Sequence, residues 1–405
     1  MAINPEYQTS MEDGMLVPVR HPFYRRTGNP LRDLVDDINF PHFCYKAVAY
    51  TYVLTILWGF YMILPLPGHW STDGQPDNVT IFSRDYTNYF DVFKVSSACH
   101  LQAPDLYLPA IDAIPSLNGS SYCSTRLGFL SAISEGNTSS PDIQHWVQGC
   151  RYPWYSIDEI CTIIGRFSAI IFVGDSSLQS IYNGFNILLR QDLVNGCLAT
   201  WDMPDGAQLH CRCENQFTEP FCVKYFVNSS LQLPPQSWRA DRRDKYHCDR
   251  STRHEYLEVN YSPAPTTVLD KLDSLITRPG PSASQRKPVA IVHGLSPDSL
   301  PVERAAASVF EFKHRASSLT ANALMLWIGP GATGTREPLN DDRDREIRAF
   351  DEYMALSAAR FGVDVLGMWK ATFHAWSLDG PRSQEKLAIT QAMMVVNWLS
   401  WLEAR

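Results

Sequence analysis

The sequence predicts an α/β protein in which helices cover a parallel sheet, with disulfide-rich insertions and a single transmembrane helix before the sheet. Three observations lead to this prediction. Short apolar runs alternate with helical patterns after residue 168, nine of the ten cysteines lie after residue 98, and residues 47–66 carry no charge. Short apolar strands that alternate with helices are typical of a parallel sheet with helical layers.

The charge-free segment, residues 47–66, is 20 residues long, which is enough for a helix to cross a bilayer. A buried core helix is the alternative interpretation. A cleaved signal peptide fits less well, because the apolar run starts late and is too long. Basic residues gather before the segment (Arg20, Arg25, Arg26, Arg32 and Lys46), whereas Arg84 is the only one from residue 67 to residue 93. The positive-inside rule therefore predicts a type II signal anchor with the bulk of the chain lumenal or extracellular, in the Golgi, the endoplasmic reticulum or the plasma membrane.

This anchor divides the chain into four predicted parts. Residues 1–46 form a polar cytosolic tail, and residues 67–98 form a stem that is rich in Pro, Gly, Asp and Asn. Residues 99–405 form the lumenal domain, in which residues 99–165 are expected to be a loop-rich cap. Residues 195–285 contain many prolines, several cysteines and little periodicity, so they are interpreted as a disulfide-rich insertion.

The cysteines after the anchor predict disulfides, because the lumen is oxidising. The stretch CRCENQFTEPFC, which begins at Cys211 and follows His210, could instead hold a metal, but its spacing does not match the common zinc pattern. Nine is an odd number, so one thiol should stay free or pair between chains. Five glycosylation sequons also lie after the anchor, at Asn78, Asn118, Asn137, Asn228 and Asn260.

The predicted strands are the apolar runs 169–173, 289–293, 324–328 and 363–366, and the predicted helices are 178–193, 302–317, 341–360 and 384–403. In open α/β sheets, ligands bind beyond the carboxyl ends of the strands. The turn after Val173, the loop after His293, the turn at residues 329–334 and the loop after Leu366 should therefore meet at one edge.

Ser176, in the stretch FVGDSS, is the candidate nucleophile at this edge. It follows a strand directly and precedes a helix, where backbone N–H groups of Gly174 and Ser176 could hold an oxyanion. The alternative is a serine that caps the helix, a role that Asp175 would share. Asp175 is also a candidate substrate-binding residue.

A serine nucleophile needs a base and an acid, and three residues are candidates. Asp379 could orient the base, or it could belong to an ordinary Asp-Gly turn. His374 could be the base if its loop folds back toward Asp379, or it could be an ordinary surface histidine. His293 ends a predicted strand and could be the base or a hydrogen-bond donor, or it could be bonded within the rim of the sheet.

Several functions are disfavoured by the sequence. The formal net charge of −8 argues against a general nucleic-acid binder. The turn WIGPGATG lacks a phosphate-loop lysine, so it does not indicate a nucleotide site. No motif for a metal or an organic cofactor is present. Trp369 is a candidate for stacking on a sugar.

The stretch FVGDSSLQS resembles the GDS block of the SGNH-type PC-esterase group, which includes the plant trichome-birefringence-like glycan O-acetyltransferases. The C-terminal stretch from FGVDVLGMWK to VVNWLSWL resembles the terminal block of fungal membrane-anchored members, and WIGPGATGTREP and CRCENQF resemble internal blocks. The resemblance implies a three-layer flavodoxin-like fold and a Ser–His–Asp site that acts on acyl esters, usually acetyl groups on carbohydrate. It implies that Ser176 is the nucleophile and Asp379 the acid, with a glycan as acceptor.

The chain departs from this family at one position. The family pattern ends in Asp-x-x-His, with the histidine as base, and Arg382 stands at that position here. An arginine stays protonated, so it cannot accept the proton of Ser176, although it could bind a substrate carboxylate or phosphate. Three interpretations remain. The chain is an active hydrolase or O-acetyltransferase with His374 or His293 as base, an impaired member that binds glycan or protein, or a membrane-tethered structural domain.

Overall fold

The computed structural model describes residues 51–56, 93, 99, 101, 122–135, 150, 152–233, 246–248, 252–277, 287–333, 342–379 and 384–402. The chain divides into two units, Met1–Ser83 and Arg84–Arg405. In the first unit, residues 51–56 are helical with exposed side chains. No helix within the described ranges is long and apolar enough to cross a membrane. The other residues of the predicted anchor at 47–66, the tail at 1–46 and most of the stem at 67–98 lie outside these ranges.

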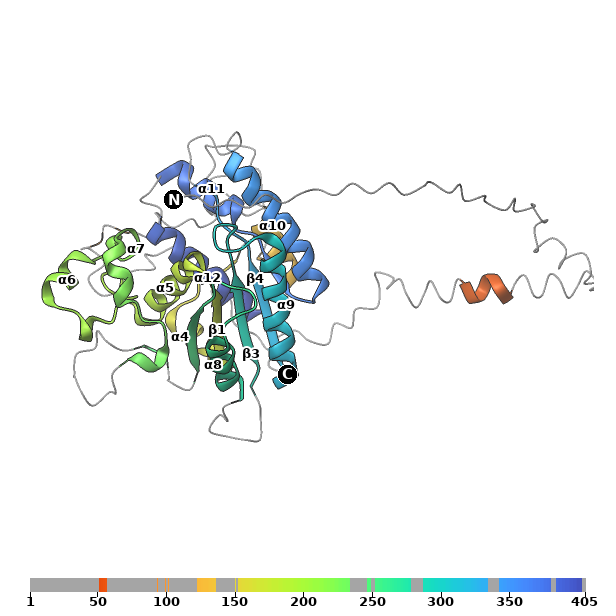
Figure 1. Cartoon of the computed structure of the whole chain (residues 1–405), viewed down its shortest axis with the longest axis horizontal. Helices are drawn as coiled ribbons and strands as arrows, with labels where there is room; N and C mark the ends of the chain where they lie inside the picture. The colour runs from red at the N-terminus through yellow and green to blue at the C-terminus, as the bar shows by residue number, and fades with distance from the viewer. Residues whose placement is uncertain are drawn as a thin grey trace, which may run out of the picture. The chain divides into compact units, whose positions relative to one another are not determined.

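The second unit contains a five-stranded, all-parallel sheet, which confirms the predicted α/β class. The strands are ordered β2-β1-β3-β4-β5, and Figure 1 labels β1, β3 and β4 of this sheet. Their bounds are β1 Ala169–Gly174, β2 Arg253–Glu258, β3 Val289–Gly294, β4 Ala323–Ile328 and β5 Asp364–Leu366. Gly174 aligns with both Glu258 and Gly294, so the carboxyl ends of three neighbouring strands meet at one edge.

Helices cover both faces of this sheet, and β1 shows why. All six of its residues are buried, and successive side chains of a strand point to opposite faces. Ile170 and Phe172 pack into one core and Ile171 and Val173 into another. The first core includes α3 (Arg126–Glu135), α4 (Ile157–Ile164), α5 (Ser176–Arg190), α11 (Trp369–Asp379) and α12 (Gln384–Ser400), and the second includes α8 (Thr266–Thr277), α9 (Val302–Leu319) and α10 (Asp342–Arg360).

Helices α5 and α12 cross at very close range. A Cβ atom on Gly184 of α5 would lie 2.2 Å from the carbonyl oxygen of Ala388 in α12. Only a glycine permits this approach of the two backbones. The crossing brings the first turns of α12 beside the first turns of α5, at the carboxyl edge of the sheet.

The four predicted strands and four predicted helices are present within a few residues of their expected ends. However, β2 and α8 also lie within residues 195–285, which the sequence analysis assigned to an insertion. β2 has the sequence RHEYLE, in which Arg253, His254, Glu255 and Glu258 are ionisable, so it gives no apolar run. Within the predicted insertion at residues 195–285, the part that contributes no strand to the sheet therefore ends before Arg253. It contains α6 (Asp205–His210) and α7 (Asn215–Thr218).

Four disulfides are present among the described residues, which confirms the prediction of disulfides, and one of them attaches Cys248 to Cys161 of α4. The pairs are Cys99–Cys213, Cys123–Cys150, Cys161–Cys248 and Cys211–Cys222. The CxC stretch that was a metal alternative therefore contributes to two disulfides. Cys197 is the one free cysteine among the described residues, and it is buried.

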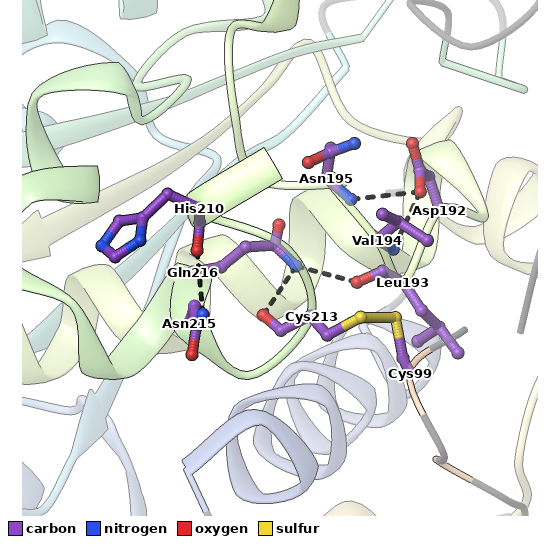
Figure 2. The surroundings of a disulfide bond; sticks show 9 residues. All are labelled: Cys99, Asp192, Leu193, Val194, Asn195, His210, Cys213, Asn215 and Gln216. Atoms are coloured by element: carbon purple, nitrogen blue, oxygen red, sulfur yellow. Dashed lines mark hydrogen bonds between the residues drawn. A yellow bond between two sulfur atoms is a disulfide. The ribbon is translucent and has the colours of Figure 1, made fainter. Parts of the chain in front are cut away.

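The surroundings of Cys99–Cys213 show how the insertion is fixed to the end of α5 (Figure 2). The side-chain amide of Gln216 donates to the carbonyl oxygens of Leu193, at 2.8 Å, and of Cys213, at 3.1 Å. The same side chain accepts a hydrogen bond from the Cys197 thiol at 3.1 Å. One buried glutamine thus joins the free thiol, the disulfide and the segment after α5.

Candidate functional site

A cavity of about 450 Å³ lies at the carboxyl edge of the sheet. Its walls are the first turns of α5 and α12, the loops that follow β3 and β4, and Thr372 of α11. This is the edge at which the sequence predicts a ligand site. The loop after β5 was also expected there, and the cavity instead meets the helix that follows it.

Ser176 is the first residue of α5, and its exposed side chain lines the cavity. It does not cap the helix. Asp175 occupies the cap position, and its Oδ1 accepts the Ser177 N–H at 3.0 Å. No described side chain hydrogen-bonds the Ser176 hydroxyl. The alternative in which Ser176 serves as a helix cap is therefore not the observed arrangement.

Asp175 is a buried carboxylate whose two oxygens are both occupied by protein donors. Oδ1 also accepts the Ser177 hydroxyl at 2.5 Å. Oδ2 accepts the backbone N–H and the hydroxyl of Ser296, each at 2.7 Å, and the hydroxyl of Ser299 at 2.6 Å. Burial by itself would raise the pKa of Asp175, but these hydrogen bonds together lower the pKa below its usual value. The carboxylate fixes loops in place and does not line the cavity, which differs from the predicted role in binding substrate.

Gly174, the other predicted oxyanion residue, is enclosed by neighbouring strands and does not line the cavity. A Cβ atom at this position would lie 2.0 Å from the carbonyl oxygen of Gly294. The Tyr256 hydroxyl donates to the carbonyl oxygens of Gly174, at 2.9 Å, and of Asp175, at 2.8 Å. Gly174 therefore shapes the turn before Ser176, and of the predicted oxyanion pair only Ser176 borders the cavity.

His293 lies on the other face of the sheet from α5. Its side chain is 0% exposed and packs against Phe312 of α9 and Trp327 of β4. Nε2 is 3.1 Å from the Ser308 hydroxyl. Burial lowers the pKa of His293 to about 3 and outweighs the opposing effect of the Asp175 charge, so the ring is neutral. The structure does not bring His293 to Ser176, and the interpretation of His293 as base is not supported.

Trp369 is buried by contacts within the protein and does not line the cavity. Its indole N–H donates to Oδ1 of Asp344 at 3.2 Å, and its ring stacks on Phe373 at a centroid distance of 5.3 Å. The Arg348 guanidinium lies 5.2 Å from the ring centroid. These contacts occupy the indole, so the predicted stacking of Trp369 on a sugar is not supported.

The segment with His374 and Asp379 does not fold back as a loop. Both residues belong to α11, which is continuous from Trp369 to Asp379. Positions five residues apart on an α-helix differ by about 140° around the axis, so the two positions do not share a helix face. The side chains of both residues, and all of Arg382, lie outside what the structure describes.

The loop after β4 is held by residues that the sequence analysis did not select. Asp344 of α10 is buried, and its carboxylate accepts the Thr333 N–H at 3.0 Å and the Thr333 hydroxyl at 2.8 Å. The Thr372 hydroxyl oxygen accepts the Ala332 N–H at 2.7 Å. An acidic residue in the first turn of a helix is an ordinary stabilising feature, so nothing in the sequence marks Asp344 as a residue of the site.

The described wall of the cavity is nearly uncharged. Asp298 is its only ionisable side chain, and this residue is 75% exposed and paired with Arg343. No histidine belongs to the described wall. Within the described ranges, no group of three His, Cys, Asp or Glu residues could hold a metal ion. The arrangement offers an exposed serine at a helix N-terminus, several hydroxyls and no described base.

Comparisons of the chain with protein-family models and with curated proteins find no match. Membership of the PC-esterase group therefore stays a prediction that depends on the sequence motifs.

Proposed function

We propose that this chain is a membrane-anchored acyl-ester hydrolase or O-acetyltransferase that acts on carbohydrate acetyl groups through Ser176. One observation carries the proposal. Ser176 lies exposed in a cavity at the carboxyl edge of a parallel sheet, at the first position of a 15-residue helix. The strand order β2-β1-β3-β4-β5 supports the finer assignment to a flavodoxin-like SGNH fold, because that order is the one found in flavodoxin-like proteins.

In the proposed reaction the Ser176 hydroxyl attacks the ester carbonyl and forms a tetrahedral oxyanion. The first N–H groups of an α-helix have no partner within the helix and so can bind a developing negative charge. Ser177 already gives its N–H to Asp175. The N–H of Ser176 itself is therefore the oxyanion donor that we propose. The intermediate would then collapse, breaking the bond to the sugar oxygen, which leaves as an alcohol with the proton that Ser176 gave up, and an acyl-Ser176 ester remains. Water or a glycan hydroxyl would attack this ester and give its own proton to the base, which returns a proton to Ser176.

The proton of Ser176 needs an acceptor, for which we propose His374. Thr372 of α11 lines the cavity, so this helix borders the site. Position 374 lies about 200° around the helix axis from position 372, so His374 would reach Ser176 only through a rearrangement of α11. Because α11 is continuous, Asp379 would act on His374 only through a rearrangement of the end of that helix.

A second function is favoured by a specific observation. The described wall of the cavity contains no histidine, and Arg382 replaces the base in the family pattern. A chain without a base would keep the cavity and bind an acylated glycan without efficient turnover. Loss of the base typically removes most of the rate of such a site.

Labelling with a fluorophosphonate probe separates these functions. We expect covalent labelling of the wild-type chain and none of Ser176→Ala, with Ser180→Ala as a control, because Ser180 contributes another hydroxyl to the same cavity. Labelling of Arg382→His but not of wild type would favour the second function. If neither the wild type nor Arg382→His is labelled at Ser176, serine ester chemistry is excluded.

The membrane anchor belongs to the same proposal, and it depends on the uncharged stretch at residues 47–66 and on its flanking charges. In sealed microsomes we expect protease to remove only the N-terminal tail. Complete digestion without detergent would contradict the proposed orientation.

A further inference from the structure

We infer that Gln391 is a ligand-positioning residue of the Ser176 cavity and that its ligand is an uncharged carbohydrate. This inference deepens the proposed function and rests on it for the carbohydrate class of the ligand. The inference does not depend on turnover. A cavity that only binds the glycan and a cavity that also cleaves its ester would both need the contact between Gln391 and the ligand.

Gln391 is a buried polar residue in the wall of the cavity. It lies in the second turn of α12, is 7% exposed, and lines the cavity together with Gln384 and Ala388 of the same helix. Positions 384, 388 and 391 fall on one face of a helix, so the whole face is turned to the cavity. No described residue hydrogen-bonds the Gln391 side chain.

Two other buried polar residues of α12, Thr390 and Asn397, donate hydrogen bonds to the protein, whereas Oε1 of Glu385 and Oδ1 of Asn397 have no partner within the described residues. The hydroxyl of Thr390, directly before Gln391, donates to the carbonyl oxygen of Lys386 at 2.7 Å. The Asn397 amide donates to the carbonyl oxygens of Pro153, at 3.0 Å, and of Met393, at 2.9 Å. Buried polar groups are normally hydrogen-bonded, because leaving one without a partner costs free energy. A ligand in the cavity would supply the missing partner of Gln391.

The charges around the cavity indicate which ligands it accepts. The described wall has no cationic side chain, and the Asp175 carboxylate keeps a negative charge next to the hydroxyls of Ser177, Ser296 and Ser299. An anionic ligand would be repelled by this carboxylate, which opposes the favourable field at the start of α5. The only ionisable side chain in the described wall, Asp298, is already paired with Arg343, so a cation has no dedicated partner.

The remaining polar groups suit a polyhydroxylated neutral molecule. A carboxamide presents both a donor and an acceptor, and a sugar hydroxyl can satisfy either. Ser180 and Thr333 line the same cavity, together with the apolar residues Ile181, Ile328 and Leu387. The two hydroxyls donate to the carbonyl oxygen of Ser176 and to Asp344, so toward a ligand they can act as acceptors. Apolar walls with a few oriented polar groups are typical of ligand sites. The apolar residues would contact the acyl methyl group or the C–H face of the sugar.

The test measures glycan binding by the full-length chain in detergent, with Ser176→Ala present to prevent turnover. The probes are neutral and uronic-acid oligosaccharides on an array, each with and without O-acetyl groups. We expect retention of neutral glycans and about tenfold weaker binding when Gln391→Met or Gln391→Glu is added, because the ligand then loses a hydrogen bond to the amide. Thr390→Val is the matched control, because it changes the neighbouring buried polar residue without changing the cavity wall, and it should bind as tightly as the parent.

A second readout distinguishes ligand positioning from a structural role. Gln391→Met removes an unpartnered polar group from a buried site, so the melting temperature should stay the same or rise. A clear fall in melting temperature would indicate that Gln391 supports the fold. The inference would be overturned by such a fall in melting temperature or by unchanged glycan binding of Gln391→Met. It would also be overturned if the chain preferred acidic glycans or retained no glycan.

This experiment can fail separately from the proposed chemistry. Binding of neutral glycans that depends on Gln391, in a chain whose Ser176 is never labelled, would support the inference and exclude the esterase. Labelling of Ser176, together with glycan binding that is unchanged in the Gln391 variants, would support the serine esterase chemistry and overturn the inference about Gln391.

Discussion

The carboxylate of Asp175 accepts a hydrogen bond of 2.6 Å from the hydroxyl of Ser299, which lies 124 positions further along the chain. The same carboxylate also binds Ser296 and Ser177. One buried anion thus fixes the loop after β3 against the first turn of α5, and both of these segments form walls of the Ser176 cavity. The shape of the cavity therefore depends on a residue that does not line it.

Asp175→Asn should destabilise the fold by about 2–4 kcal/mol, because an amide cannot accept hydrogen bonds on both sides and leaves buried donors without partners. Urea unfolding followed by tryptophan fluorescence measures this loss. Asp298→Asn is the control, because Asp298 is exposed, and it should change the free energy of unfolding by no more than about 0.5 kcal/mol. Equal stabilities of the two variants would show that Asp175 does not hold the loops.

The pH dependence of this contribution has a defined sign. The pKa of Asp175 is lowered in the folded state, so the stabilisation is present above the ordinary pKa of 3.8 and is lost as the pH falls through the lowered value. The free-energy difference between wild type and Asp175→Asn should therefore shrink only in acid. A difference that shrinks between pH 5 and pH 8 would contradict this assignment.

Gly184→Ala should destabilise the protein by several kcal/mol, because its Cβ would meet the carbonyl oxygen of Ala388 at 2.2 Å and force α5 and α12 apart. Gly206→Ala is a matched control, because nothing lies within 4 Å of a Cβ at that helical position. It should be neutral or stabilising by up to about 1 kcal/mol, since alanine favours helix. Thermal unfolding of both variants checks the prediction. Similar melting temperatures for the two would show that the close crossing of α5 and α12 is not required.

Helix α12 also contains a carboxyl group whose titration should affect stability. Burial, together with the charge of Glu214, raises the pKa of Glu385 to about 8, against a small opposing effect of Lys386. Between the ordinary pKa of 4.5 and this value, the folded chain holds a proton that the unfolded chain has released. Stability should therefore fall as the pH rises through this window, by up to about 1.4 kcal/mol per pH unit.

Glu385→Gln should flatten this decrease, because a glutamine does not titrate. Free energies of unfolding at pH 5, 6, 7 and 8 would measure the slope. Part of the slope should persist in the variant, since burial and the charge of Glu352 raise the pKa of Asp351 to about 7, which acts in the same direction. Identical slopes for wild type and Glu385→Gln would show that Glu385 does not titrate in this range.

The sequence predicts those strands of the sheet whose buried side chains are apolar and so need no hydrogen-bond or ion-pair partner. β1 and β3 are fully buried and apolar, so their runs are visible in the sequence. β2 is also largely buried, but it contains His254 and Glu255, whose burial is compensated elsewhere. Nδ1 of His254 is 3.0 Å from the Tyr182 hydroxyl of α5, and Glu255 pairs with Lys271 of α8. Those partners are distant in sequence, so the pattern of β2 alone gives no strand signal.

The site was predictable to a similar extent. The rule that ligands bind beyond parallel strands identified the position of Ser176 at the cavity. The rule does not say which face of the sheet His293 occupies, and its side chain packs against α9. Gln391 carried a signal that was overlooked, because it is a long polar side chain within the largely apolar stretch AITQAMMVV. A polar residue inside a helix that is buried on all sides requires either a partner or a ligand.

The thiol of Cys197 should be unreactive in the folded protein. It is buried, it donates a hydrogen bond to Oε1 of Gln216 at 3.1 Å, and burial raises its pKa well above the usual range. The thiolate is the reactive form, and neither maleimide nor a second chain can reach this sulfur. In a Cys44→Ser background, intact mass after maleimide treatment should show no label in native buffer and a single label in urea without reductant. A label in native buffer at unchanged melting temperature would show that Cys197 is accessible and could pair between chains.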